Sequence, residues 1–253
     1  MIIIDSIIKL LMIIKLLNTM KLKSNFLNIN NNISTLIKRS NSNNVRSTAS
    51  SGSKVYESKR AVYEYVLMHY GESNDIMPYA FKEKDALNFA ERVSKLCSKH
   101  AIDKKRVLDL GCAVGGSSFH LTKSFNEVIG IDFSKHFIDA ANDMKKNKQM
   151  DYEILKQGQV YIKRTAKVPD GIDTSKASFE VGDGCNLRTT LGQFDLILCS
   201  NLLCRLPSPR KFLNSVKDFL TPKGIVILIS PYSWLEEYTP VSEWVGAKDN
   251  IDR

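Results

Sequence analysis

The residues RVLDLGCAVGG, numbered 106–116, constrain the fold of this chain more than any other stretch. Residues 106–110 are mostly apolar, as expected for a strand that is buried on both faces of a sheet. Gly111 and Gly115 allow a tight turn and a close approach of the backbone to a ligand. Helical spacing follows over residues 117–125. This order of strand, glycine-rich turn and helix predicts a ligand site at the carboxyl end of the strand.

Apolar runs of strand length recur along the rest of the chain, and helical patterns separate most of them. They predict four further strands, over residues 127–133, 177–183, 194–200 and 224–230. Ser134 and Ser208 are placed as N-caps of two of the helices, and Pro209 suits a first helical turn. Strands that alternate with helices in this way form parallel βαβ units. We therefore predict an α/β fold with a Rossmann-like, doubly wound, mostly parallel sheet.

Two amphipathic helices are predicted before the first strand, one over residues 55–71 and a second with Asp85 as its N-cap. We expect them to cover the ligand pocket. His69 and Tyr70 end the first helix, although a lone histidine on such a face is more often a packed residue than a catalytic one. Residues 150–176 alternate around a Gln-Gly pair, so we expect a hairpin insertion that flanks the substrate pocket.

The net charge of +9 is concentrated at the amino-terminal end of the chain. Residues 1–54 hold eight of the 36 basic residues and one of the 27 acidic ones, so the remainder is nearly neutral. This balance argues against a nucleic-acid partner. Residues 1–17 are apolar, but three charged side chains interrupt them, so we expect no membrane span.

We expect residues 1–54 to be a disordered, basic, Asn- and Ser-rich leader outside the fold. It is either a mitochondrial presequence or a tail without a targeting signal, and the protein is accordingly expected to be mitochondrial or cytoplasmic. The five cysteines form no C-x-x-C pair, which favours buried free thiols in a reducing compartment over a metal site.

Acidic residues at two strand ends suggest which ligand the turn binds. Asp109 precedes Gly111 by two residues, and Asp132 ends the second predicted strand, 21 residues beyond Gly111. An acid at that distance is placed to accept hydrogen bonds from the ribose hydroxyls of an adenosine ligand. A dinucleotide fingerprint fits only if Ala113 replaces its middle glycine. A tight turn with no ligand is the other interpretation.

The D-x-G-x-x-x-G loop, with acids ending the second and third strands and Ser-Asn ending the fourth, resembles class I S-adenosylmethionine-dependent methyltransferases. The resemblance implies S-adenosylmethionine as the cofactor, no metal, and no catalytic residue that the sequence identifies. It also implies a contact between the acid that ends the third strand and the adenine amino group. The cofactor-binding residues implied are Asp109, Gly111, Cys112, Ala113, Gly115, Asp132, Phe133, Asp183, Gly184, Ser200 and Asn201.

One family within this class resembles the chain more closely, over residues 56–246. The matching segments include LDLGCAVGGSSFHL, FDLILCSNLLCRLPSP and SPYSWLEEYTP. They are similar to the carboxyl-terminal methyltransferase domain of ovothiol-biosynthesis enzymes. The resemblance implies methyl transfer to an imidazole nitrogen of a thiohistidine, a small-molecule substrate. The substrate-side residues expected from it are His69, Tyr70, Arg205, Tyr232, Trp234, Glu236 and Tyr238.

The chain departs from this family in two respects. Many members carry an iron-dependent sulfur-inserting module before this domain, so here we expect a separate enzyme to supply the thiohistidine. The expected domain, residues 55–253, is also short of the last two strands, which predicts an unpaired apolar edge on the fifth strand. The alternatives are another small-molecule methyltransferase of the same fold and a truncated, non-catalytic relative. For Trp234 and Tyr238, packing in the core is as well supported as substrate contact.

Overall fold

The computed structural model describes residues 2–3, 56–78, 87–231 and 233–246. These residues belong to one compact unit, and the predicted leader, residues 1–54, lies outside the described residues apart from Ile2–Ile3. Asp85 and Tyr232 also lie outside them. No helix of the described part combines the length and the apolarity needed to cross a bilayer.

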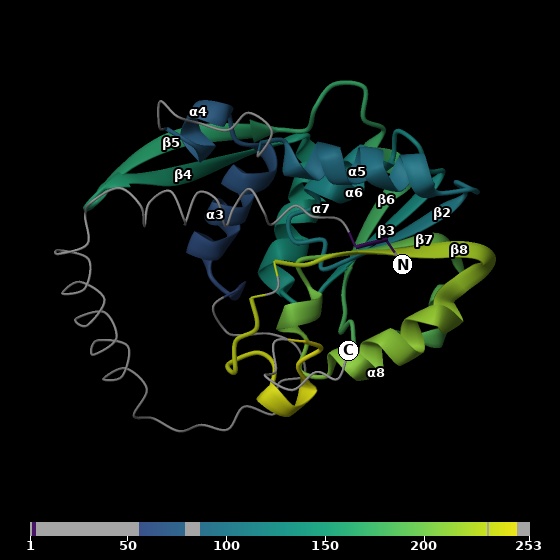
Figure 1. Cartoon of the computed structure of the whole chain (residues 1–253). Coiled ribbons are helices and arrows are strands. Elements are labelled where there is room, and N and C mark those ends of the chain that lie inside the picture. The colour runs from purple at the N-terminus through teal and green to yellow at the C-terminus, as the bar shows by residue number, and fades with distance from the viewer. Residues whose placement is uncertain (1, 4–55, 79–86, 232, 247–253) are drawn as a thin grey trace. The chain divides into compact units, whose positions relative to one another are not determined.

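A parallel sheet forms the centre of the molecule, in the order β1-β8-β7-β2-β3-β6 (Figure 1). From the central strand β2 the chain moves outward through β3 to β6, and it then crosses to β7 and β8 on the other side of β2. This is the predicted doubly wound sheet, and its order reverses between β2 and β7. The strands are β1 (Ile2–Ile3), β2 (Arg106–Leu110), β3 (Glu127–Asp132), β6 (Ala177–Val181), β7 (Phe194–Ser200) and β8 (Leu220–Ile229).

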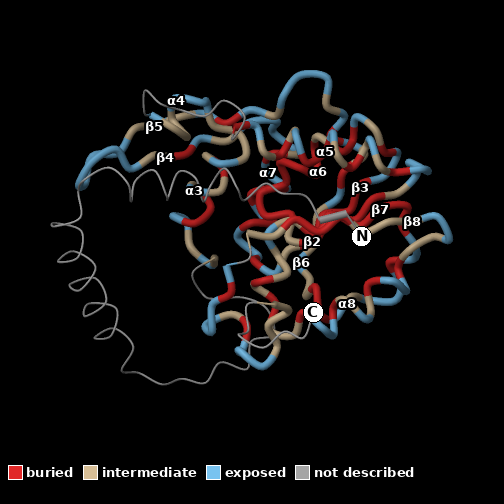
Figure 2. Tube along the Cα trace, viewed as in Figure 1, coloured by how far each residue is buried: buried red, intermediate tan, exposed pale blue. Residues whose placement is uncertain are grey.

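Helices cover both faces of this sheet, as Figure 1 shows. Consecutive residues of the central strands alternate between two apolar clusters, so Val107 packs in one and Leu108 in the other. The central strands are buried along most of their length (Figure 2). The helices are α3 (Lys59–Tyr70), α4 (Ser73–Ile76), α5 (Phe89–His100), α6 (Gly116–Leu121), α7 (Lys135–Asn147) and α8 (Pro209–Ser215).

The expected hairpin is confirmed as an antiparallel pair, β4 (Gln149–Gln157) and β5 (Val160–Lys167). It packs against α3 and α4. Tyr152 is buried beside Tyr63 of α3, and Arg164 forms a bidentate salt bridge with Asp75 of α4, at 2.6 and 3.0 Å. The insertion therefore supports the helix that precedes the sheet.

The structure corrects three expectations at the carboxyl-terminal end. Ser208 does not cap α8, because its hydroxyl donates to Glu243 at 3.0 Å. Strand β8 begins at Leu220, which pairs with Phe194 of β7, and not at the predicted residue 224. The edge of β8 is not wholly unpaired, because Ile2–Ile3 add to it in parallel register.

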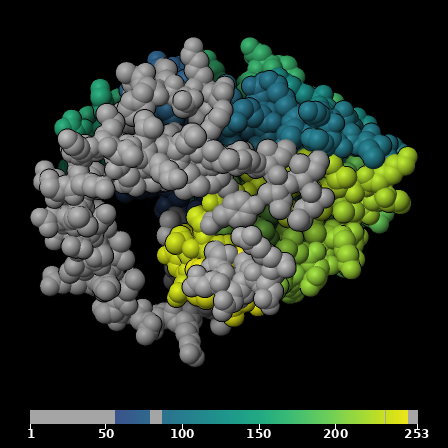
Figure 3. Space-filling view, in the orientation of Figure 1, coloured from purple at the N-terminus to yellow at the C-terminus, as the bar shows by residue number. Residues whose placement is uncertain are grey.

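Residues 233–246 fold back onto the segment between β7 and α8. The Thr239 hydroxyl, which is fully buried, donates to the carbonyl of Leu206 at 2.6 Å. In Figure 3 these residues, in yellow, lie on the same face as the green residues around α8. This return brings two segments that are far apart in the sequence to one end of the sheet.

Asp195 joins the starts of three neighbouring strands, and its loss is expected to destabilise the fold. This buried carboxylate accepts the backbone N–H groups of Lys105 and Arg106, at 2.8 and 2.9 Å, and lies 3.2 Å from the hydroxyl of Thr221. Asp195→Ala leaves both N–H groups without this acceptor, so we expect the free energy of unfolding to fall by about 2–4 kcal/mol. Urea denaturation measures this loss. A smaller loss for Asp195→Asn is expected, and a loss below about 0.5 kcal/mol for Asp195→Ala contradicts the assignment.

Candidate cofactor and substrate site

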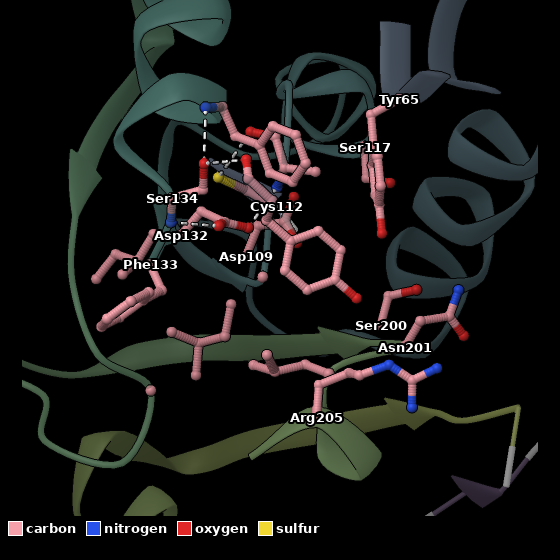
Figure 4. Close-up of a pocket in the computed structure, with 18 of the residues that line it drawn as sticks. Tyr65, Asp109, Cys112, Ser117, Asp132, Phe133, Ser134, Ser200, Asn201 and Arg205 are labelled. Carbon is pink, nitrogen blue, oxygen red and sulfur yellow. Dashed lines mark hydrogen bonds between the residues drawn. The ribbon is translucent and has the colours of Figure 1, made fainter. Parts of the chain in front are cut away.

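A cavity opens at the carboxyl ends of β2, β3 and β7, beside the point where the strand order reverses. Open α/β sheets bind ligands at this position. Figure 4 shows Asp132, Phe133 and Ser134 on one side of the cavity and Ser200, Asn201 and Arg205 on another, with Asp109 and Cys112 between them. Tyr65 of α3 and Ser117 of α6 complete the labelled wall.

The glycine-rich turn is held in shape by its neighbour strand. Gly111 has a φ of +73° and donates its N–H to the carbonyl of Ile131 at 2.8 Å. Ala113 also has a positive φ, +47°, which is unusual for a residue with a Cβ. Its N–H donates to the carboxylate of Asp132 at 2.9 Å, and this bond compensates for the strained backbone.

Asp132 uses both carboxylate oxygens to organise the loop, because the N–H of Ser134 donates to the second oxygen at 2.9 Å. Each oxygen keeps a further lone pair, so the carboxylate can still accept hydrogen bonds from a ligand. Burial raises the pKa of this carboxyl to about 6, although the N–H groups of Ser134 and Ala113 act in the opposite direction.

Asp109 is a second buried acid in the cavity wall, with only 1% of its surface exposed. The hydroxyl of Ser118 donates to it at 2.6 Å. Burial raises its pKa to about 7, since desolvation disfavours the charged form more than one hydroxyl can offset. A cationic group of a ligand would favour the charged form of this carboxyl and form an ion pair with it.

Aromatic side chains from three parts of the chain build the opposite wall. Tyr65 of α3 lies with its ring 4.6 Å from that of Phe137, and burial raises the pKa of its phenol. Tyr56 stacks on Tyr238, with ring centroids 6.1 Å apart. These contacts confirm that the helix before the first strand covers the pocket, as the sequence predicted.

Arg205 lies where this aromatic wall meets the carboxyl end of β7. Its guanidinium donates to the carbonyl of Ser233 at 2.7 Å and lies 4.8 Å from the ring centre of Tyr238. The salt bridges among the described residues do not include Arg205, so its charge is met there by neutral acceptors and a ring face. A ligand carboxylate is the group that such a guanidinium suits best.

Most of the predicted site residues line this cavity, but several do not. Gly115 supports the loop from beneath, since a Cβ there would lie 2.8 Å from the Phe179 ring. Asp183 accepts the N–H of Cys185 at 2.9 Å. The predicted residues that line the cavity are His69, Asp109, Gly111, Cys112, Ala113, Asp132, Phe133, Gly184, Ser200, Asn201 and Arg205.

The substrate-side predictions from the last segment are largely displaced from the cavity. Trp234 is buried and stacks on Trp244 at 6.3 Å, which favours its role in packing. Glu236 is exposed, and Tyr238 reaches the site only through its contacts with Tyr56 and Arg205. Tyr70 donates its hydroxyl to the carbonyl of Val114 at 2.7 Å. The hairpin supplies none of the described residues that line the cavity.

Sequence reasoning missed part of the wall. Ser117 could have been found, because it directly follows the glycine-rich turn, and Gly182 adjoins the predicted acid at the end of β6. The helical pattern carried no signal that Tyr65 or Phe89 faces a ligand. The other lining residues that the sequence did not identify are Tyr56, Glu57, Met68, Leu110, Ile131, Ser134, Phe137 and Leu202.

Comparison with known families decides the class. Residues 102–249, more than half of the chain, match the family model described as a methyltransferase domain. The chain belongs to this methyltransferase family. Its cofactor is S-adenosylmethionine, as the sequence predicted, and the fold prediction is confirmed as well.

Curated relatives of this methyltransferase act at three kinds of atom. The chain is 28% identical to a chloroplastic tocopherol O-methyltransferase of Arabidopsis thaliana and 25% identical to a norajmaline N-methyltransferase of Rauvolfia serpentina, with 50% of the chain aligned in each case. It is also 25% identical to a human thiol S-methyltransferase, over 58% of the chain. The alignments span 30%, 36% and 54% of these relatives.

Solved structures that are similar to this chain include a [4+2]-cyclase, SpnF. The TM-score is 0.48 and the sequence identity 17%, and the match covers 69% of this chain and 57% of that one. A TehB-like methyltransferase from Corynebacterium glutamicum has a TM-score of 0.44 and 18% identity, and the match covers 68% of this chain and 73% of that one.

The residues of the cavity fit S-adenosylmethionine. Asp132 retains lone pairs for two ribose hydroxyls, and the Asp109 carboxyl suits the ammonium group of the amino-acid end. The buried hydroxyl of Ser200 lines the cavity and has no hydrogen-bond partner among the described residues. A bound ligand would supply that partner. When bound, the cofactor supplies an electrophilic methyl group on a sulfonium sulfur.

Proposed function

We propose that this methyltransferase methylates an imidazole nitrogen of a thiohistidine-type amino acid. The proposal rests on the placement of Arg205, which lies in the segment that most resembles the ovothiol-biosynthesis family and lines the cofactor cavity. Its guanidinium donates to neutral acceptors of Cys204 and Ser233, so its positive charge suits the carboxylate of an amino-acid substrate, while the rings of Tyr56 and Tyr65 offer flat surfaces for an imidazole. A separate enzyme would then introduce the sulfur.

In this reaction the chain mainly controls position. Displacement at a sulfonium methyl requires the nucleophile, the carbon and the leaving sulfur to lie in line, so binding geometry contributes much of the rate. The sulfur of a thiohistidine is a softer nucleophile than its ring nitrogen. Methylation at nitrogen therefore requires the pocket to turn the ring so that the nitrogen faces the methyl group, and holding the amino-acid end at Arg205 is one means of doing so.

The direct test mixes the full chain with methyl-labelled S-adenosylmethionine and 5-thiohistidine and locates the methyl group by mass spectrometry. We expect labelled methyl on a ring nitrogen and none with histidine lacking sulfur. A phenol, a tertiary amine and a simple thiol complete the panel, since the relatives methylate oxygen, nitrogen and sulfur. Methyl on sulfur, or turnover of another panel compound alone, overturns the proposal while keeping the methyltransferase class.

Substitution of Arg205 tests how the substrate is held. We expect Arg205→Gln to raise the KM for thiohistidine at least tenfold, because a charged hydrogen-bond partner of the carboxylate is lost. The affinity for the cofactor should stay within a factor of two to three of the wild type in calorimetry. Arg210→Gln, at an exposed position of α8, is the matched control. An unchanged KM for Arg205→Gln removes this residue from the substrate site.

A further inference from the structure

His69 is the one histidine among the described residues lining the cavity, and its ring is held in place by the first residue of α6. The N–H of Gly116 donates to the Nδ1 atom of His69 at 3.1 Å. An atom that accepts a hydrogen bond from an N–H must carry a lone pair, so the ring proton lies on Nε2. The contact therefore selects one tautomer, with a fixed N–H donor at Nε2.

The glycine at position 116 is part of this arrangement. A Cβ built there would lie 2.5 Å from Nδ1 of His69 and 2.9 Å from its Cβ and Cγ atoms. No side chain fits between the ring and the helix without moving one of them. The absence of a side chain at Gly116 thus allows the close approach that fixes the tautomer.

The surroundings keep this ring neutral. Burial lowers the pKa of His69 to about 4, and the nearby His120 acts in the same direction. With its lone pair engaged by Gly116, the ring is poorly placed to remove a proton from a substrate. The adjoining cavity wall carries a second potential donor, the hydroxyl of Ser117.

We propose that His69 is a tautomer-locked hydrogen-bond donor whose Nε2–H binds a negatively charged acceptor in the cavity. That acceptor is either the carboxylate at the amino-acid end of the cofactor or an anionic atom of the methyl acceptor. The inference rests on the proposed methyl transfer at this cavity, although it does not require thiohistidine to be the substrate. His69 is accordingly a binding residue, and the ring is not the base of the reaction.

Three variants of the full chain separate the possibilities. His69→Phe keeps a ring but removes both nitrogen atoms, whereas His69→Gln keeps one acceptor for Gly116 and one N–H donor. Gly116→Ala leaves the histidine intact and displaces it. His100→Gln, at the end of α5, controls for the loss of a histidine elsewhere. Thermal melts of all variants establish that each is folded before binding is compared.

Calorimetry with S-adenosylhomocysteine, which carries the same carboxylate, tests the cofactor source. Steady-state kinetics with whichever panel compound the wild type methylates tests the substrate source. We expect His69→Phe and Gly116→Ala to raise either the Kd for S-adenosylhomocysteine or the KM for the methyl acceptor at least tenfold. His69→Gln should restore most of the lost affinity. A raised Kd for S-adenosylhomocysteine identifies the cofactor carboxylate as the acceptor of the His69 hydrogen bond. A raised KM alone identifies the methyl acceptor.

Two results overturn the inference. The first is that both constants stay within a factor of two in folded His69→Phe; if a step in the pH dependence of kcat is lost as well, the ring is a base. The second is that His69→Gln is as defective as His69→Phe. If wild type fails on thiohistidine but the cofactor constant falls in His69→Phe, only the proposed substrate is refuted.

Discussion

Asp109→Asn is expected to stabilise the protein at pH 8 and to weaken its binding of the cofactor. The folded-state pKa of Asp109, about 7, lies above the ordinary value of 3.8. As pH rises from about 4 to about 7, the unfolded chain loses this proton while the folded chain retains it, so stability falls through that range. Removing the ionisable group abolishes a penalty on the order of 4 kcal/mol at pH 8.

Chemical denaturation of the wild type and of Asp109→Asn at pH 5 and pH 8 measures this effect. The gain from the substitution should be several times larger at pH 8. Asp103→Asn, which removes an exposed carboxylate just before β2, is the matched control for the loss of an acidic side chain. Calorimetry of Asp109→Asn should show at least tenfold weaker cofactor binding, because the ammonium group of the cofactor loses a charged partner. An equal gain from Asp109→Asn at both pH values would mean that Asp109 ionises as freely in the folded protein as in the unfolded chain.

Asp132→Ala is expected to reduce the affinity for S-adenosylmethionine at least tenfold. The substitution removes the acceptor for the ribose hydroxyls and also the bonds to the N–H groups of Ala113 and Ser134. Because Ala113 sits at positive φ, loss of its partner should let the glycine-rich turn relax from its binding shape. Asp132→Asn should fall between the wild type and Asp132→Ala, since an amide supplies one acceptor where the carboxylate supplies two.

The ionisation of Asp132 adds a pH dependence to this prediction. Its pKa, raised to about 6, means that the carboxylate form grows from a minor to the major species between pH 5 and pH 7. Cofactor affinity should increase over that range in the wild type, and Asp132→Asn should show a smaller increase, because only the ionisation of Asp109, with a pKa of about 7, then remains. Glu127→Gln, at the opposite end of the same strand, is the matched control. Unchanged affinity in Asp132→Ala would remove this acid from the site.

The linear sequence was sufficient for the sheet and for the loop at its centre. Strands β2 and β7 begin and end where their apolar runs do, and the Ser134 N-cap is confirmed by its bond from the N–H of Phe137 at 3.2 Å. These features depend on local physics: apolar runs bury themselves, glycine adopts positive φ, and a serine hydroxyl satisfies a free helical N–H. The acids at the ends of β2 and β3 were found for the same reason, because strand ends of a parallel sheet meet at one edge.

The other wall of the site depended on contacts between distant segments. Tyr65 and His69 read as part of an amphipathic helix, and only the packing of α3 against α6 and α7 turns them toward the cavity. Trp234 and Tyr238 lie four residues apart in one aromatic-rich segment, yet the first packs on Trp244 and the second beneath Arg205. Sequence spacing determines neither outcome, because each depends on which distant neighbour covers the ring once the chain has folded.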